Sequence, residues 1–332
     1  MIIHLKKEIP TAEAKQIAHN LEAIRYYNGT HEILITPSAT KTLHPDIIAK
    51  SDGHWVMDTD IQLASRNYSD TLREIKWGTT TIGGTSKNTP VIAGPCSIES
   101  WEQIEESAKL LVSLGITTLR AGCFKPRTSP YSFQGLELEG LKMLAEVRKQ
   151  YHLNIITEVK DSSHVDAVIE YADIIQVGAK AMYDQSILRR CGEARKPVLL
   201  KRGFGTTLQE FVQAAEFILS GGNEQVILCE RGIRTFETKT RFTFDLCGAA
   251  YLKFHTNLPV ILDPSHAMGY AYGVPDLAKA SVAFGCDGLL IEVHPTPKLA
   301  KSDASQQLDH PTFKQLFEEM KAIAAAVGRN LI

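Results

Sequence analysis

The chain has 332 residues, of which 44% are hydrophobic and 22% charged, an ordinary globular mixture that excludes disorder and low complexity over most of its length. Its 36 Lys and Arg residues nearly balance 38 Asp and Glu residues, so the net charge of −2 gives no sign of a nucleic-acid or membrane-surface partner. Six cysteines without a CxxC pair exclude a disulfide scaffold and a zinc ribbon. The N-terminal segment lacks the apolar core of a signal peptide, and no apolar run approaches the ~18 residues of a membrane span, so we expect a cytoplasmic protein.

Residues 1–75 predict a small α/β module. Strand-like runs occur at residues 2–5, 32–36 and 54–64, and a helix-compatible stretch runs from Thr11 to Tyr26. We interpret this module as ferredoxin-like, with a regulatory role as the hypothesis. Residues 76–89 are rich in Gly, Thr, Ser and Asn and predict a linker or a polar hairpin.

From Pro90 onward, short apolar strands alternate with helix-compatible stretches. The predicted strands cover residues 91–94, 116–122, 154–159, 173–178, 197–203, 225–232, 259–266 and 288–295. Eight such repeats over about 240 residues predict a (β/α)8 TIM barrel spanning residues 90–332. A doubly wound open sheet is the alternative, but it usually needs fewer repeats and a GxGxxG turn, which is absent after the first strand.

Polar or small residues follow the C-terminal end of every predicted strand, the end at which barrels carry their chemistry. Any one of them could be a helix cap or a surface charge. That all eight strands end in such residues is hard to explain by structural roles alone, because charged groups that converge on one mouth of a barrel are desolvated and repel one another. In chain order they are Cys96, Arg120, Lys125, Glu158, Gln176, Gly178, Lys201, Arg202, Glu230, Arg231, Asp263, His266, Glu292 and His294.

Two groups stand out within this set. The cations Arg120, Lys125, Arg127, Lys201, Arg202 and Arg231 need counter-charge, which predicts at least two bound anionic groups such as phosphate and carboxylate. The second group is Cys96, His266, Glu292 and Asp303. Its mixture of sulfur, nitrogen and oxygen donors suits a divalent ion such as Mn²⁺, Fe²⁺, Co²⁺ or Zn²⁺ rather than Ca²⁺.

Seven motifs carry a family resemblance. They are GPCSIES (94–100), KPRTSPYSFQG (125–135), ADIIQVGA (172–179), PVLLKRGF (197–204), ILCERGIRTFE (227–237), ILDPSHAMG (261–269) and IEVHPTP (291–297). Together they closely resemble the 3-deoxy-D-arabino-heptulosonate 7-phosphate (DAHP) synthases of the type I-beta subgroup, over nearly all of residues 90–330. The sister family, the 3-deoxy-D-manno-octulosonate 8-phosphate synthases, shares GPCSIE and the barrel but lacks the KPRTSP segment.

The resemblance implies roles for individual residues. It assigns the metal, with Mn²⁺ as first choice, to Cys96, His266, Glu292 and Asp303. It assigns phosphoenolpyruvate to Arg120, Lys125, Lys201 and Arg231 with the backbone of Gly178 and Ala179, and erythrose 4-phosphate to Lys125, Pro126, Arg127 and Thr128. Lys125, His266 and Glu158 are the candidates for proton transfer, and the sequence does not choose among them.

The implied function is a metal-dependent transferase of aromatic amino acid and chorismate biosynthesis. It condenses phosphoenolpyruvate with D-erythrose 4-phosphate and water to give DAHP and phosphate, the first step of the shikimate pathway. The resemblance also implies a homotetramer and, for the N-terminal module, an aromatic amino acid effector. The alternatives are an octulosonate synthase that uses arabinose 5-phosphate, a Schiff-base aldolase with Lys201 as nucleophile, and a non-catalytic amino acid sensor.

Cys123 lies three residues past Arg120, and Cys96 lies just past the preceding strand. Neighbouring strands run ~4.8 Å apart, so their ends can bring two thiols near disulfide range. We therefore hypothesise a Cys96–Cys123 disulfide in the metal-free protein, against the alternative that Cys123 is a small buried filler.

Overall fold

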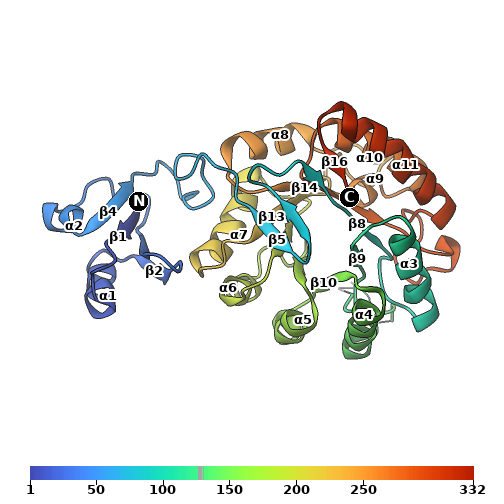
Figure 1. Ribbon diagram of the computed structural model, residues 1–332, viewed down its shortest axis with the longest axis horizontal. Coiled ribbons are helices and arrows are strands. Elements are labelled where there is room, and N and C mark those ends of the chain that lie inside the picture. Colours follow the sequence, from blue (N-terminus) through green and yellow to red (C-terminus); the bar gives the residue numbers. More distant parts are fainter. Residues whose placement is uncertain (126–128, 130) are drawn as a thin grey trace.

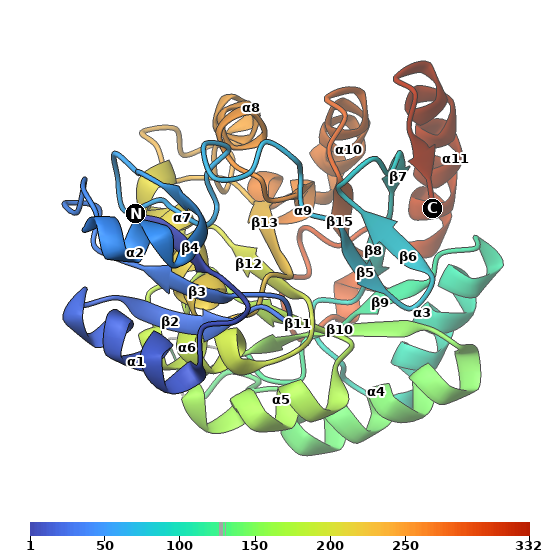
Figure 2. The ribbon, with the colours of Figure 1, turned by 60° about the vertical axis from the view of Figure 1, so that its left-hand side comes forward.

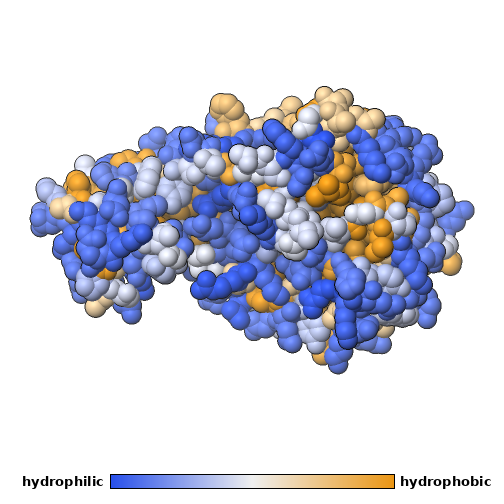
Figure 3. All heavy atoms as spheres, viewed as in Figure 1, coloured by the Kyte–Doolittle hydropathy of each residue, from blue (hydrophilic) through white to orange (hydrophobic). Residues whose placement is uncertain are grey.

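The computed structural model describes residues 1–125, 129 and 131–332. An N-terminal module projects from one side of a larger barrel (Figure 1), and the view turned by 60° shows its sheet lying beside the barrel near α6 and α7 (Figure 2). The face seen in Figure 3 is mostly hydrophilic, with hydrophobic residues gathered in a few areas.

The module has the element order βαββαβ. Its elements are β1 (Ile2–Leu5), α1 (Thr11–Asn20), β2 (Ile24–Tyr27), β3 (Glu32–Ile35), α2 (Pro45–Ala49) and β4 (Ser51–Trp55). The strands form an antiparallel sheet in the order β2-β3-β1-β4, as in ferredoxin-like folds. Alternate residues face opposite sides, so Ile3 and Leu34 pack with Ile17 of α1, while Ile2 and Ile33 join the core cluster that includes the barrel.

Two predictions for the module were wrong in extent. The helix expected from Thr11 to Tyr26 ends at Asn20, and Glu22 adopts a left-handed backbone with φ 52° that breaks the helical path. Residues 24–27 then form β2, paired in register with β3 from Ile24 opposite Ile35. The strand expected over residues 54–64 ends at Trp55, because the chain beyond it leaves the sheet.

The predicted barrel is confirmed. Its strands are β8 (Val91–Gly94), β9 (Thr118–Arg120), β10 (Asn154–Val159), β11 (Ile174–Val177), β12 (Val198–Lys201), β13 (Val226–Glu230), β14 (Val260–Leu262) and β15 (Gly288–Glu292). They pair in parallel and close in the order β10-β11-β12-β13-β14-β15-β8-β9. Closure excludes the open doubly wound sheet.

Helices surround the barrel on its outer side (Figure 2). They are α3 (Trp101–Ser113), α4 (Glu137–Tyr151), α5 (Val165–Tyr171), α6 (Gln185–Glu193), α7 (Leu208–Ser220), α8 (Leu246–His255), α9 (Pro264–Met268), α10 (Val274–Ala283) and α11 (His310–Ala326), with short 3₁₀ turns at Ser162–His164, Ala271–Gly273 and Pro297–Leu299. Side-chain caps set several of the starts; Thr207 and Glu210 form a reciprocal capping box on α7. Within the described part of the chain, no helix is both long and apolar enough to cross a membrane.

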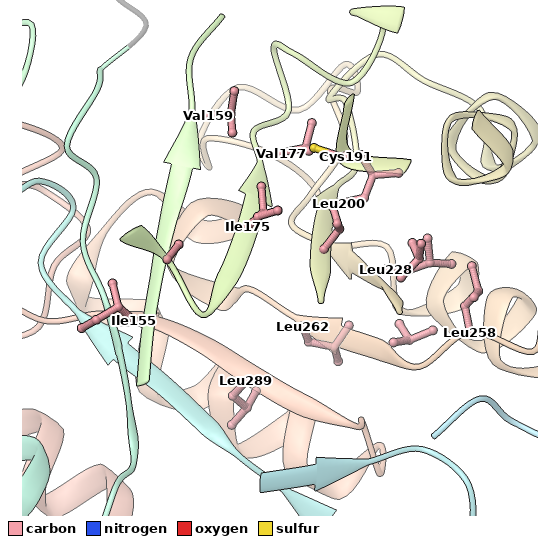
Figure 4. Packing of buried hydrophobic residues seen from close by; sticks show 14 of the residues in the cluster. Ile155, Val159, Ile175, Val177, Cys191, Leu200, Leu228, Leu258, Leu262 and Leu289 are labelled. Carbon is pink, nitrogen blue, oxygen red and sulfur yellow. The ribbon is translucent and has the colours of Figure 1, made fainter. Parts of the chain in front are cut away.

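Side chains alternate between the inside and the outside of the barrel. Ile156, Ile174, Leu199, Ile227 and Ile261 form the interior cluster with Ile92, Cys229 and Leu290. Their neighbours along the strands pack outward under the helices. Figure 4 shows this outer layer, with Ile155, Ile175, Leu200, Leu228, Leu262 and Leu289 among its labelled members. A residue two positions further along a strand therefore faces the same side.

A hairpin closes the N-terminal end of the barrel. It consists of β5 (Ile75–Trp77) and β6 (Thr80–Ile82), and Ile75, Trp77 and Ile82 belong to the interior cluster. The Trp77 indole donates to the Thr118 hydroxyl at 2.9 Å. Next to it, β7 (Asn88–Thr89) pairs with β16 (Asn330–Leu331) near the C-terminus. The hairpin covers the end of the barrel opposite the predicted chemistry.

A partly buried carboxylate fixes the connection between module and barrel. Glu216 of α7 is partly buried and accepts hydrogen bonds from the backbone N–H groups of Gln62 (2.8 Å), Leu63 (3.1 Å) and Ala64 (2.8 Å). The N-terminal ammonium group of Met1 donates to the Gln62 side chain at 2.7 Å. Residues 62–64 are thus held by the barrel on one side and by the module on the other.

We expect the Glu216→Ala variant to lose about 2–4 kcal/mol of unfolding free energy in urea, because three buried N–H groups lose their acceptor. The matched control is Glu193→Ala at the exposed end of α6, which should change stability by less than about 0.5 kcal/mol. Equal stability of the two variants would contradict this role for Glu216.

Burial raises the pKa of Glu216 from about 4.5 to about 7, against the opposing effects of its N–H donors and of Arg73. A raised carboxyl pKa contributes stability that is present below pH 4.5 and is lost as the pH rises through 7. The unfolding free energy of the wild type relative to Glu216→Gln should therefore fall by up to about 3 kcal/mol between pH 4.5 and 7.5. A flat or rising difference would show that the N–H bonds outweigh burial.

Candidate active site

A cavity of about 130 Å³ lies at the C-terminal ends of the barrel strands. Its lining comprises Lys125, Glu158, Ala179, Lys180, Lys201, Phe204, Arg231, Arg241, Phe242, His266 and Asp303. The structure thus brings several of the residues that the sequence singled out to one cavity. A larger cavity of about 810 Å³ lies between the module and the barrel, remote from these residues.

Strand alternation decides which of the predicted residues enter the site. Glu158, Lys201 and Glu292 each follow an interior residue by two positions and face inward. Arg202 and Glu230 instead follow the outward residues Leu200 and Leu228. Arg202 pairs with Glu230 and Asp245, each at 2.8 Å, and is not among the residues that line the cavity. Its placement among the cations of the mouth was therefore wrong.

The predicted metal ligands come together. Ligand atoms of Cys96, Glu292 and Asp303 lie within 4.8 Å of one another, and Nε2 of His266 is 3.5 Å from Oε1 of Glu292. Burial raises the pKa of the Cys96 thiol to about 12, with Glu292 adding to the effect. Burial also lowers the pKa of His266, which favours the neutral imidazole that a metal requires. One thiol, one imidazole and two carboxylates fit a borderline divalent ion.

Residues 302–307 hold these ligands in place, and the sequence analysis singled out only Asp303 among them. The Ser302 hydroxyl lies 3.0 Å from the Cys96 sulfur, and the Gln307 side chain accepts the Cys96 backbone N–H at 2.9 Å. The buried Gln306 amide donates to Oε2 of Glu292 at 2.6 Å. Such outer contacts orient metal ligands. The run of polar residues SDASQQ (302–307) is the feature of the sequence that could have indicated these contacts.

Asp263 links the metal site to the predicted phosphoenolpyruvate site. Its Oδ2 lies 2.7 Å from the Lys201 amine and 2.8 Å from Nδ1 of His266. Burial alone would raise the pKa of Asp263, but His266 and Lys201 hold it well below its usual range. This contact at Nδ1 leaves Nε2 of His266, which is 3.5 Å from Oε1 of Glu292, available to a metal.

Two further cations lie beside the ligands. The Arg120 guanidinium is 2.5 Å from Oε1 of Glu292, which raises the arginine pKa despite burial. The Lys125 amine contacts the Cys96 sulfur at 3.1 Å and its carbonyl at 3.2 Å. Arg120, Lys201 and Arg202 thus have carboxylate partners within the protein, so part of the positive charge at the mouth is already balanced.

Arg231 differs from these cations. Its side chain is only 4% exposed, and neither Nε nor Nη1 has a hydrogen-bond partner among residues 1–125, 129 and 131–332. A buried cation with free donors on the wall of a cavity is a site for an anion. Lys125 and Lys201 line the same cavity, so three of the four side chains predicted to contact phosphoenolpyruvate face one space.

Glu158 lies against the predicted backbone contact. Its carboxylate accepts from the Gln176 amide at 2.5 Å and packs so close to Gly178 that a Cβ there would meet Oε1 at 2.5 Å. Glycine at position 178 therefore lets a carboxylate and the backbone share this wall. Pro126, Arg127 and Thr128, the predicted erythrose 4-phosphate contacts, lie outside the described residues.

The structure favours the filler alternative for Cys123. Its sulfur lies 3.2 Å from where a Cβ on Gly140 of α4 would be, and the residue belongs to the core cluster outside the barrel. The Cys96 sulfur instead contacts Ser302 and Asp303, and all six cysteines are free.

A sequence model of the DAHP synthetase I family matches residues 62–326. The chain belongs to this family. The N-terminal module precedes the matched region, and the match begins at the segment that Glu216 holds.

Known relatives agree with this membership. A phospho-2-dehydro-3-deoxyheptonate aldolase of Thermotoga maritima is 45% identical over 238 residues, which cover 72% of this chain and 70% of that protein. A 2-dehydro-3-deoxyphosphooctonate aldolase of Stenotrophomonas maltophilia is 31% identical over 258 residues, covering 72% of this chain and 92% of that protein. The crystal structure of a Thermotoga maritima DAHP synthase superposes with a TM-score of 0.80 at 36% identity, over 100% of this chain and 99% of that one.

We expect the Cys96→Ala and His266→Ala variants to bind Mn²⁺ at least about 100-fold more weakly than the wild type, because each removes one of the four predicted ligands. Metal content after dialysis, measured by mass spectrometry, reports the loss independently of activity. Cys247→Ala is the matched control, since Cys247 is exposed and outside the site. Full metal content in a folded Cys96→Ala or His266→Ala protein would refute the assignment.

Proposed function

We propose that this chain condenses phosphoenolpyruvate with D-erythrose 4-phosphate and water to give DAHP and phosphate. The observation that carries the proposal is that two sites lie next to each other at one cavity. Arg231, whose Nε and Nη1 have no hydrogen-bond partner within the described residues, lines it with Lys201, and the Cys96, His266, Glu292 and Asp303 set reaches it through His266 and Asp303. Membership of the family and the 45% identity to the Thermotoga protein support it.

In this proposal the cations receive phosphoenolpyruvate. Arg231, Lys201 and Lys125 bind its anionic groups from the cavity wall, and Arg120 lies beside them against Glu292. Because these groups are buried and already oriented, they stabilise the charge that develops during carbon–carbon bond formation without reorganising. The backbone of Gly178 and Ala179 completes the wall beside Glu158.

The metal would be held by Cys96, His266, Glu292 and Asp303, with Mn²⁺ as the first choice. When bound, a divalent ion supplies Lewis acidity toward the aldehyde oxygen of the sugar phosphate. Asp263 holds the imidazole of His266 through Nδ1, so this ring serves as a ligand and has no nitrogen left for proton transfer.

Proton transfer then falls to Lys125 and Glu158, which both line the cavity. Nearby Cys96 and Glu158 raise the pKa of Lys125 against the effect of burial, so its ammonium form can donate a proton to the new alkoxide. Glu158, held by Gln176, is positioned to accept the proton of the attacking water. The Schiff-base alternative is disfavoured, because the Lys201 amine is engaged by Asp263 at 2.7 Å.

We predict strong preference for erythrose 4-phosphate over arabinose 5-phosphate, because the sequence carries the KPRTSP segment (125–130), which resembles the erythrose 4-phosphate contacts of DAHP synthases and which the octulosonate synthases lack. The measurement is phosphate release from phosphoenolpyruvate with each sugar, with and without EDTA. Activity with arabinose 5-phosphate alone would instead indicate the octulosonate reaction named for the Stenotrophomonas relative. No phosphate release with either sugar would leave the sensor alternative.

For the module we propose regulation by tyrosine or phenylalanine, in a homotetramer. Its separate sheet and its attachment through residues 62–64 support a unit that can respond to a ligand apart from the chemistry. Residues 62–75 themselves contact the barrel: Glu216 holds Gln62, and Ile75 packs in its interior. We therefore place the dispensable part before residue 62 and not at residue 75.

Deletion of residues 1–58 should leave catalysis within about threefold of the wild type and abolish inhibition by millimolar tyrosine or phenylalanine, since the predicted site lies after Pro90. A truncated Thermotoga maritima DAHP synthase, which aligns with 82% of this chain at a TM-score of 0.76, supports the folding of such a form. Deletion of residues 1–75 is the comparison, and it should destabilise the barrel by removing the partners of Glu216. An uninhibited full-length protein would show that the module has another role.

A further inference from the structure

Burial of the charged Arg231 side chain costs free energy that contacts with its neighbours must offset. The side chain is 4% exposed, and Nε and Nη1 have no hydrogen-bond partner in the described part of the chain. Other buried cations here have carboxylates: Arg120 has Glu292 at 2.5 Å, and Lys201 has Asp263 at 2.7 Å. A buried charge without such compensation is costly.

Phe242 supplies a different kind of partner. The guanidinium carbon of Arg231 lies 4.2 Å from the centroid of the Phe242 ring, within the range of a cation–π contact. The ring is in turn stacked on Phe204 at 5.6 Å with an interplanar angle of 27°. An aromatic face stabilises a cation without using any of its N–H donors, whereas a carboxylate would occupy them and cancel the charge.

The backbone around Phe242 is built for this contact. Gly232 adopts φ +93°, and a Cβ on it would lie 2.7 Å from the Cβ of Phe242, so only glycine allows this approach. The Phe242 N–H donates to the carbonyl of Ala267 at 3.0 Å, beside the predicted ligand His266. Ile233 and Thr243 exchange backbone hydrogen bonds of 2.9 Å on either side. Phe242 is therefore held by bonds that do not involve the cavity.

We propose that Phe242 is a positioning residue for the phosphate group of the substrate. Its ring lies against the Arg231 guanidinium and holds it in place, so that Nε and Nη1, which have no hydrogen-bond partner within the described residues, are left for an anion. The inference rests on the proposed function, in which Arg231 receives phosphoenolpyruvate. Sequence reasoning missed Phe242 because it lies eleven residues beyond Arg231 and carries no polar group.

The test compares Phe242→Leu with Phe242→Tyr in the full-length, metal-loaded protein. Loss of the ring should raise the KM for phosphoenolpyruvate and the inhibition constant of inorganic phosphate by the same factor, about tenfold. Turnover at saturation should change less than about threefold, and Mn²⁺ affinity should not change. The tyrosine variant keeps the ring and should stay within about twofold of the wild type.

Two controls separate positioning from general damage. Phe236→Leu removes a ring that is 98% exposed and should have no effect. Phe242→Met keeps apolar volume without a ring and should match Phe242→Leu; circular dichroism and thermal unfolding establish that each variant is folded. If phosphate inhibition is unchanged in both ring-less variants, the inference is wrong.

Arg231→Gln distinguishes failure of the inference from failure of the proposed function. It should weaken phosphate binding more than Phe242→Leu does, and adding Phe242→Leu to it should cost less than twofold more, since the ring acts through Arg231. Unchanged phosphate binding in Arg231→Gln would overturn the anion site itself. Independent, multiplicative losses in the double variant would overturn only the role of Phe242.

Discussion

Alternation of side chains along the strands of a closed barrel is the constraint on which the site depends. Each interior position is followed, two residues later, by another that faces inward, and at the C-terminal ends these positions are polar. Glu158, Lys201 and Glu292 enter the mouth for this reason. Arg202 and Glu230 are one position out of step, so they pair with each other outside the cavity.

Some of the buried cations at the mouth have a carboxylate partner, and Arg231 has an aromatic ring. Glu292 and Asp263 neutralise Arg120 and Lys201, and Asp263 also orients His266. Only part of the positive charge therefore remains for a ligand, and Arg231 carries it with an aromatic neighbour in place of an acid. An anion entering the cavity meets donors that need no rearrangement, which is the arrangement that lowers the cost of charge development.

The N-terminal end of the barrel, opposite the mouth, is closed by packing. Trp77 and its hairpin fill the interior at the N-terminal end of the barrel. Glu216 binds residues 62–64, which connect the barrel to the module. Residues 62–64 and Ile75 fall within the module predicted to end at residue 75, yet both contact the barrel. The physical division between the two parts consequently falls nearer residue 62, where the family match also begins, than residue 75.

The sequence by itself determined the eight strands, their order and the residue types at their ends, because apolar runs and turn residues are local signals. The resemblance of the motifs to a known family predicted the four metal ligands and the role of Arg231. Tertiary structure alone decided that the helix after Thr11 ends at Asn20, that Arg202 faces outward and that Cys123 packs under α4. It alone placed Phe242 on Arg231 and Glu216 on residues 62–64, because these contacts join segments whose proximity depends on closure of the barrel and no local pattern encodes it.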